Sequence, residues 1–364
     1  MAMPVKLTRV LLFAVFAAPH CFSQSGVAPT ALRILDETPI TSLPLNSNRF
    51  RVTSGENEFY IQTGPGTYVG VDLDGRTHSA FDVAKVPASN SMKPSDLFVC
   101  DLAPDLRGGV DALVEWTKAA QATSASPAKE EESYGILRFD QHGDYDELVP
   151  LEVHFNPTHV AEFSSGRGFL IAGYDEHGKI DVALFDSRGK ILISGVRLGS
   201  ETDRMAQRTG DEKPIEHDAR SAIAAGILQL AGGDDDAVYV FDPSRGRKVI
   251  RVRPDGQTEE ITLPEPAGLT GAGTQPLALY VSHSNLYLCE AILDKGHVAG
   301  DAMVLKRFAL SVYDRFSGTL DGSFEIDNTF GASPVALSPR EFHFLNAKVV
   351  PGQGLIFSII RAAP

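Results

Sequence analysis

The residues of this chain that are best suited to chemistry gather in short segments. The densest segment places Glu216, His217, Asp218 and Arg220 within five positions. A base, two carboxylates and a guanidinium so close together could polarise a carbonyl group or hold an anion. The alternative is a solvated connector in which Asp218 caps a short helical turn. We therefore treat this segment as a ligand-binding candidate, with no catalytic residue identified.

Histidine spacing suggests a second candidate, a metal site. His154 and His159 are five residues apart with Pro157 between them, and Asp175 and His177 follow. An offset of five suits neither one face of a helix nor one side of a strand. In a loop these side chains could still reach one divalent cation. Unrelated loop polarity explains the same residues, and no other cofactor is evident.

Two further segments complete the ligand-binding candidates. Asp294 and His297 lie in a charged stretch with Asp301, without the spacing of an EF-hand. Trp116 ends a predicted strand, where its ring could stack on a sugar or a proline, or pack between neighbouring elements. The acidic run at 233–236 falls in a short turn, and we expect a solvated hairpin there.

Composition narrows the classes of partner. The chain has 33 basic and 47 acidic residues, a net charge of -14. A surface this acidic repels nucleic acid and anionic lipid, and suits a soluble exported protein or a cationic partner. No nucleophile elbow, phosphate loop or dinucleotide fingerprint is present. We expect a monomer that binds no nucleic acid and has no membrane span.

The first residues have the pattern of an export signal. Lys6 and Arg9 precede an apolar run at 10–18, which Pro19 ends. The run is about half as long as a bilayer-spanning helix requires. We predict that residues 1–23 are a cleaved signal peptide, so that the protein is periplasmic or secreted.

The remaining residues, 24–364, are predicted to form a single domain. Lipid attachment at Cys21 is disfavoured because a histidine precedes it, where a small residue is usual. Cys100 and Cys289 fall in strands of separate repeats, too far apart to bridge, and we expect two buried free thiols.

A repeat of four short strands organises this domain. The clearest copy, at 160–196, alternates β-branched and aromatic runs with Asp/Gly turns. Five copies close the same hairpin with a glycine: Gly75, Gly143, Gly189, Gly256 and Gly318. Their separations of 46 to 68 residues suit the blades of a β-propeller. The fold class is therefore all-β, with antiparallel four-stranded blades.

A sixth copy lacks one strand. Strands are predicted at 334–338, 342–350 and 354–361, and the chain then ends. An orphan strand at 31–36 precedes the first blade, and it can supply the outer strand of the last one. Six blades then account for all strands, whereas seven would require splitting a long insertion.

Two hairpins resemble a known repeat. VALFDSRGKIL at 182–192 and VYVFDPSRGRKVI at 238–250 are similar to the repeats of NHL-type six-bladed propellers. The resemblance implies a shared architecture. Proteins of this kind include protein-recognition scaffolds, ring-opening hydrolases and lyases, so the fold leaves the function open.

Long insertions indicate which end of the propeller is elaborated. Segments 117–133 and 293–307 fall between second and third strands of their blades, and 197–222 joins two blades. By strand parity all three leave from one face, and long loops on a rigid scaffold commonly carry binding. We expect a non-catalytic scaffold that binds a protein, peptide or glycan there. The alternative is a metal-dependent hydrolase or lyase of the lactonase type at the channel mouth.

Overall fold

The structure of the protein is a computed structural model. It describes residues 29–40, 43, 52–54, 58–87, 92–104, 108–118, 131–198, 228–269, 273–294, 304–326, 333–338, 341–350 and 354–364. The predicted signal peptide lies outside these residues. Within the described part of the chain, no helix is long and apolar enough to cross a membrane.

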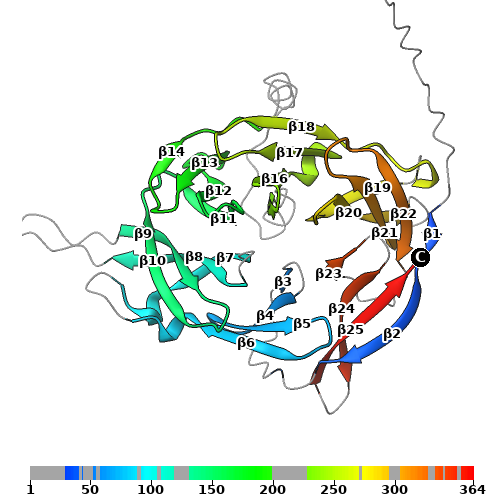
Figure 1. The fold of residues 1–364 in the computed structure, drawn as a ribbon, viewed down its shortest axis with the longest axis horizontal. Helices are drawn as coiled ribbons and strands as arrows, with labels where there is room; N and C mark the ends of the chain where they lie inside the picture. The colour runs from blue at the N-terminus through cyan, green and yellow to red at the C-terminus, as the bar shows by residue number, and fades with distance from the viewer. Residues whose placement is uncertain are drawn as a thin grey trace, which may run out of the picture.

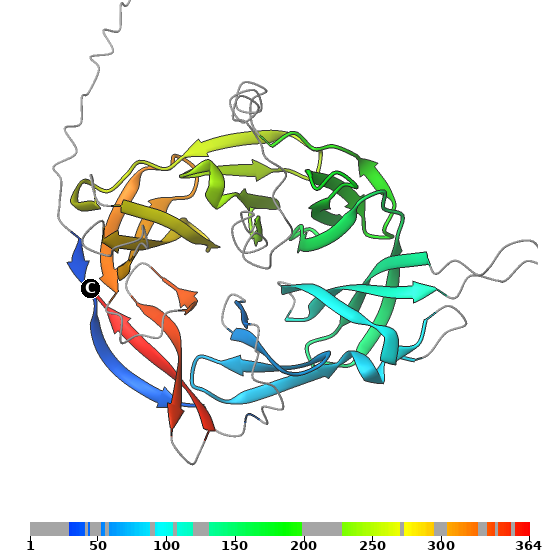
Figure 2. The same cartoon turned by 180° about the vertical axis from the view of Figure 1, so that it is seen from behind.

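Six antiparallel sheets stand around a common axis and form a six-bladed β-propeller, as predicted (Figures 1 and 2). Blade 1 consists of β3 (Val52–Ser54), β4 (Glu58–Gly64), β5 (Thr67–Asp72) and β6 (Thr77–Asp82). Blade 2 consists of β7 (Phe98–Pro104), β8 (Val110–Lys118), β9 (Glu131–Phe139) and β10 (Tyr145–Leu151). Blade 3 consists of β11 (Asn156–Glu162), β12 (Gly168–Tyr174), β13 (Ile180–Asp186) and β14 (Ile191–Ile193).

The second half of the ring repeats this order. Blade 4 consists of β15 (Gln229–Gly233), β16 (Ala237–Phe241), β17 (Lys248–Val252) and β18 (Thr258–Thr262). Blade 5 consists of β19 (Gly273–Val281), β20 (Asn285–Asp294), β21 (Val304–Asp314) and β22 (Leu320–Ile326). Blade 6 consists of β23 (Ser333–Leu337), β24 (Phe342–Val350), β25 (Gly354–Ala363) and β2 (Arg33–Pro39). Short 3-10 turns occur at Val83–Lys85, Pro94–Asp96, Pro243–Arg245 and Ala267–Leu269.

The two ends of the chain close the ring. β2 pairs antiparallel with β25 and so supplies the outer strand of blade 6, which confirms the predicted closure (blue beside red in Figure 1). Just before it, β1 (Thr30–Ala31) pairs in parallel with β22 of blade 5. The N-terminal segment therefore covers the outer edges of two adjacent blades, and this protects edges that would otherwise be unpaired.

Apolar residues on both sides of each sheet form the core between neighbouring blades. In β12, Phe169 and Ile171 pack toward blade 2, whereas Leu170 and Ala172 pack toward blade 4. Successive side chains of a strand point to opposite sides of its sheet. The continuous apolar run in this strand follows, since both of its sides are buried.

Asp/Gly turns join most of the third strands to the fourth. In the turn after β13, Asp186 Oδ1 accepts hydrogen bonds from the Arg188 and Lys190 amides, each at 2.9 Å. Gly189 has a φ of 79°, a conformation that costs glycine little. A Cβ at Gly189 would also lie 2.1 Å from the carbonyl oxygen of Pro150 in blade 2. This glycine therefore sets both the turn and the approach of two blades.

Strand order defines two ends of the ring, which we name by their connections. The loop face carries the connections from second to third strands and from each blade to the next. The turn face carries the others, which are between three and five residues long. The long connections 119–130, 199–227 and 295–303 all join described strands at the loop face, as strand parity predicted.

Two details of the sequence interpretation change. The first strand of blade 3 begins at Asn156, earlier than the predicted 160, because a register shift between Pro157 and His159 extends its pairing with β12. His159 therefore lies in a strand. Both cysteines are free, as expected, but only Cys289 is buried, and Cys100 is partly exposed.

Candidate functional sites at the two faces

Several predicted site residues fall where the structure describes no side chain. Glu216, His217, Asp218 and Arg220 lie in the connection between blades 3 and 4, outside the described residues. His297 lies outside them as well, and of Asp294 only the backbone at the end of β20 is described. These candidates keep the status of predictions.

The four predicted metal ligands are all described. His154 is exposed before β11, and His159 is half-buried within that strand, where its Nδ1 lies 2.8 Å from Thr158 Oγ1. Asp175 accepts the amides of its own turn, and His177 in that turn is exposed beside Glu176. Among the residues that the structure describes, no three His, Cys, Asp or Glu side chains are grouped to hold a metal ion. The four residues therefore do not form one site in this structure.

Trp116 is buried, which fits the packing alternative rather than the ligand-stacking one. Its side chain is 3% exposed and belongs to the apolar cluster between blades 1 and 2 with Phe81 and Phe139. The indole is thus not offered to a ligand in this structure, and the packing alternative describes it better.

The neighbouring Glu115 points to the opposite side of β8, toward blade 3, because side chains alternate along a strand. There it lies opposite Tyr134 of β9, whose hydroxyl donates to Asn156 Oδ1 at 2.8 Å and lies 3.2 Å from Glu132 Oε2. Phe98 pairs with Glu115 across β7 and is 60% exposed. We call these five residues the loop-face cluster.

Like charges define the electrostatics of the loop-face cluster. Burial raises the pKa of Glu115, and the nearby carboxylate of Glu132 raises it further. The pKa of Tyr134 is raised by burial and by the same two carboxylates. A carboxyl group that protonates readily can donate a hydrogen bond or a proton, whereas its ionised form favours a cation. The cluster lies where the 119–130 connection leaves β8 and enters β9.

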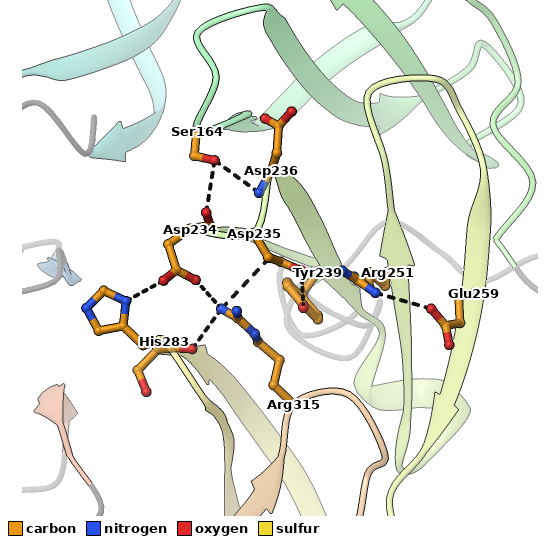
Figure 3. Close-up of polar contacts among 10 residues, drawn as sticks. Ser164, Asp234, Asp235, Asp236, Tyr239, Arg251, Glu259, His283 and Arg315 are labelled. Carbon is orange, nitrogen blue, oxygen red and sulfur yellow. Dashed lines mark hydrogen bonds and ion pairs between the residues drawn. The ribbon is translucent and has the colours of Figure 1, made fainter.

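At the turn face, charged residues of blades 4 and 5 form a second group (Figure 3). Arg315 Nη1 donates to Asp234 Oδ1 and to the Ser282 carbonyl, the latter at 3.0 Å. The other oxygen of Asp234 contacts Nδ1 of His283. Burial raises the pKa of Asp234, but the hydrogen bonds from His283 and Arg315 outweigh it and hold this pKa below its usual range.

The next residue of the same turn extends the group. Asp235 Oδ2 accepts from Arg251 Nη2 at 2.5 Å and from the Tyr239 hydroxyl at 3.0 Å (Figure 3). Arg251 also donates to Glu259 at 3.4 Å. We call Asp234, Asp235, Arg251, Glu259, His283 and Arg315 the turn-face network.

A third aspartate of that turn joins blade 4 to blade 3. Asp236 has a φ of 57°, a left-handed conformation that aspartate tolerates better than most residues. Its Oδ1 accepts from the Ser165 amide at 2.9 Å, and its amide donates to Ser164 Oγ at 3.0 Å (Figure 3). The solvated hairpin expected at 233–236 is therefore wrong. The turn is a junction of three blades, and Asp235 is only 11% exposed.

Two features of the sequence relate to this network. Three consecutive aspartates in a short turn exceed what turn geometry requires. Arg315 directly follows the aspartate of another turn, a position that Gln141 and Ser187 hold in two equivalent turns. Neither feature identifies the other as its partner, because 81 positions separate Asp234 from Arg315.

Comparison with known proteins adds little to this description. No protein-family model and no curated protein matches the chain. A Bacteroides uniformis crystal structure, provisionally assigned as a 6-phosphogluconolactonase, is 16% identical with a TM-score of 0.37, covering 84% of this chain and 80% of that one. A chain of a mitotic checkpoint complex is 15% identical with a TM-score of 0.35, covering 97% and 98%. At these scores neither similarity carries an argument about activity. The paired strands themselves establish the six-bladed propeller.

Proposed function

We propose that this protein is an exported, non-catalytic scaffold that binds a protein, peptide or glycan at its loop face. The observation that carries the proposal is the asymmetry of the connections. The connections 119–130, 199–227 and 295–303 all belong to the loop face, whereas the described strands are joined at the turn face by five residues or fewer. Loops on a rigid scaffold can vary without disturbing the core, and binding commonly resides in them.

The loop-face cluster supports this proposal with a polar and aromatic surface. Phe98 exposes 60% of its surface and offers a ring for stacking on a sugar or an apolar side chain. Beside it, Glu115 and Glu132 offer acceptors for sugar hydroxyls or for a basic side chain. A ligand that brings positive charge or donors would relieve the repulsion between these carboxylates.

Loop replacement tests the proposal. We would replace 119–130 by a two-residue Asn-Gly turn, which suits a hairpin between β8 and β9. The mature protein and this variant would be applied to glycan and peptide arrays, with thermal melting as the control for folding. We expect ligands that the variant loses at an unchanged melting temperature. Identical array profiles, or no ligand for the parent protein, would count against the proposal.

A hydrolase or lyase acting near the ring axis is the second candidate. The raised pKa of Glu115 beside Glu132 favours it, because a protonated carboxyl next to an ionised one is a usual acid–base arrangement. This candidate requires a divalent cation in its lactonase-type form. Elemental analysis, melting with and without chelator, and a lactone-hydrolysis assay would detect it. Absence of metal, of a chelator effect and of turnover would eliminate it.

Export itself has a direct test. The proposed signal peptide, 1–23, predicts that the mature protein begins at Gln24. N-terminal sequencing of protein recovered from the periplasm or medium should find this residue. An intact Met1 in protein recovered from the cytoplasm would refute the export part of the proposal.

A further inference from the structure

Phe316 is an exposed aromatic residue whose ring packs against two arginines. It lies in the turn after β21, on the turn face, and 52% of its surface is exposed. The guanidinium carbons of Arg315 and Arg251 lie 4.9 and 5.3 Å from the centre of its ring. Both distances are within the range of cation–π contacts.

The two arginines are themselves fixed and largely hidden. The side chain of Arg315 is 4% exposed, and that of Arg251 is 12% exposed. Ion pairs with Asp234, Asp235 and Glu259 hold both guanidinium groups in position. The ring of Phe316 therefore rests on a rigid support. A binding residue that is already ordered loses little entropy when a ligand arrives.

The charge that this support presents to solvent is negative. Three carboxylates pair with the two guanidinium groups, which leaves an excess of negative charge before His283 is counted. Two of the carboxylates are also the more exposed partners in their pairs with the arginines, because Asp234 is 34% and Glu259 is 54% exposed, whereas Asp235 is 11% exposed. The net charge of the chain, -14, acts in the same direction.

Buried donors under the ring lack partners. The Nε atoms of Arg251 and Arg315 make no hydrogen bond to any residue that the structure describes. These atoms are buried beneath the ring and out of reach of a ligand, so the surface left for one is the ring itself and the exposed carboxylates. A peptide can place an apolar side chain on this ring and a basic side chain against the exposed carboxylates.

We propose that Phe316, together with Asp234 and Glu259, is a docking point on the turn face for a basic peptide segment of a partner protein. Aromatic residues, phenylalanine among them, are enriched in protein interfaces relative to the rest of the surface. This site is separate from the loop face and does not depend on the function proposed there. The partner segment would place an apolar side chain on the ring and a lysine or arginine beside Glu259.

Peptide titration tests this docking point. The probes are fluorescein-labelled heptapeptides of alternating lysine and leucine, and of alternating glutamate and leucine, followed by fluorescence polarisation against the mature protein. We expect the lysine peptide to bind and the glutamate peptide not to. Phe316→Ala should weaken binding about tenfold, and Glu259→Gln about threefold, with the affinity falling as salt rises.

Leu192→Ala is the matched control, because it removes a similarly exposed apolar side chain from the outer strand of blade 3, in neither the loop-face cluster nor the turn-face network. It should leave the affinity for the lysine peptide unchanged. Phe316→Leu should retain part of the affinity if an apolar contact is required. Equal losses for Leu192→Ala and Phe316→Ala would show diffuse attraction to an acidic protein, and no loss for Phe316→Ala at an unchanged melting temperature would refute the site.

Discussion

The two faces of this propeller use acidic residues in opposite ways. At the turn face, Asp234 and Asp235 are paired with arginines that are almost fully buried. At the loop face, Glu115 and Glu132 lie near each other, and their repulsion contributes to the raised pKa of Glu115. Paired charges of the first kind fix blades against each other, whereas like charges of the second kind are stabilised when a ligand neutralises them.

Removing Arg315 should have the largest effect on stability. Arg315→Ala removes a buried guanidinium that pairs with Asp234 and Asp235 between blades 4 and 5. Breaking a fully buried pair costs about 3–5 kcal/mol, and we expect the lower end of this range, because Asp234 is 34% exposed and Asp235 keeps its pair with Arg251. Urea unfolding at pH 7, followed by circular dichroism, would measure the loss. Arg76→Ala is the control, because its pair with Asp74 is 75% and 70% exposed and should contribute less than about 1 kcal/mol. Equal losses would contradict the structural role of the network.

Two glycines of blade 3 allow the backbone packing at the two faces to be compared. Gly189 on the turn face and Gly178 on the loop face have φ values of 79° and 72°. A Cβ at Gly178 would meet nothing within 4 Å, whereas at Gly189 it would lie 2.1 Å from the Pro150 carbonyl oxygen. Gly178→Ala should cost about 1 kcal/mol through its backbone alone. Gly189→Ala should cost about 3 kcal/mol, because the clash with blade 2 is added.

Thermal melting of both glycine variants is sufficient to check this difference. A similar loss of stability at the two positions would mean that the contact between blades 2 and 3 rearranges at little cost in free energy. A larger loss for Gly178→Ala would reverse the comparison and indicate that the loop face carries the tighter packing.

Local turn chemistry made much of this fold predictable. The glycine after each aspartate predicted Gly75, Gly189 and Gly318 as hairpin ends, and all three have positive φ. The closure of the ring followed from counting strands, since one blade lacked a strand and one strand lacked a blade. These features depend on neighbouring residues, or on a rule that every sheet edge must satisfy.

Contacts between blades were not predictable in the same way. Whether Asp234 meets Arg315 depends on the rotation of blade 4 relative to blade 5, which no short segment encodes. The positions of Trp116 and Glu115 show a related limit. Both stand at the same strand end, and the alternation of side chains buries the first and directs the second toward blade 3. The two interpretations of Trp116 could therefore be separated only by the structure, which has it in the packed position.

A buried carboxylate in β20, between the two faces, should make stability depend on pH. Glu290 is fully buried, and burial raises its pKa to about 7, although Arg247 at 2.7 Å lowers it. The folded protein therefore holds this proton more tightly than the unfolded chain, whose glutamate has a pKa of 4.5. The contribution of Glu290 to stability is complete below about pH 4.5 and is lost as the pH rises toward 7, by up to about 3 kcal/mol.

Glu290→Gln should remove this dependence. The free energy of unfolding, measured at pH 5 and pH 7.5, should change in favour of the variant by about 2 kcal/mol at the higher pH. Glu260→Gln, which alters a pair with Lys248 near the surface, is the control and should show no such change. A parallel pH response of the parent protein and Glu290→Gln would mean that the Arg247 pair keeps Glu290 ionised throughout this range.

The smallest expected effect, that of Glu115→Gln on stability, separates the two faces most clearly. This substitution should leave the protein unchanged or more stable, whereas Arg315→Ala at the turn face should destabilise it. At neutral pH an ionised Glu115 is destabilising, since burial and Glu132 both raise its pKa. Glu115→Gln removes that charge while keeping the shape of the side chain, and should leave the protein unchanged or up to about 1 kcal/mol more stable. Glu132→Gln should have a similar effect, and the double variant should gain less than the sum of the two, because one repulsion is removed twice. If Glu115→Gln also weakens binding at the loop face, the charge is kept for a ligand at the expense of stability. If Glu115→Gln destabilises the protein by more than 1 kcal/mol, Glu115 is a structural group, and the loop face then uses its carboxylates as the turn face does.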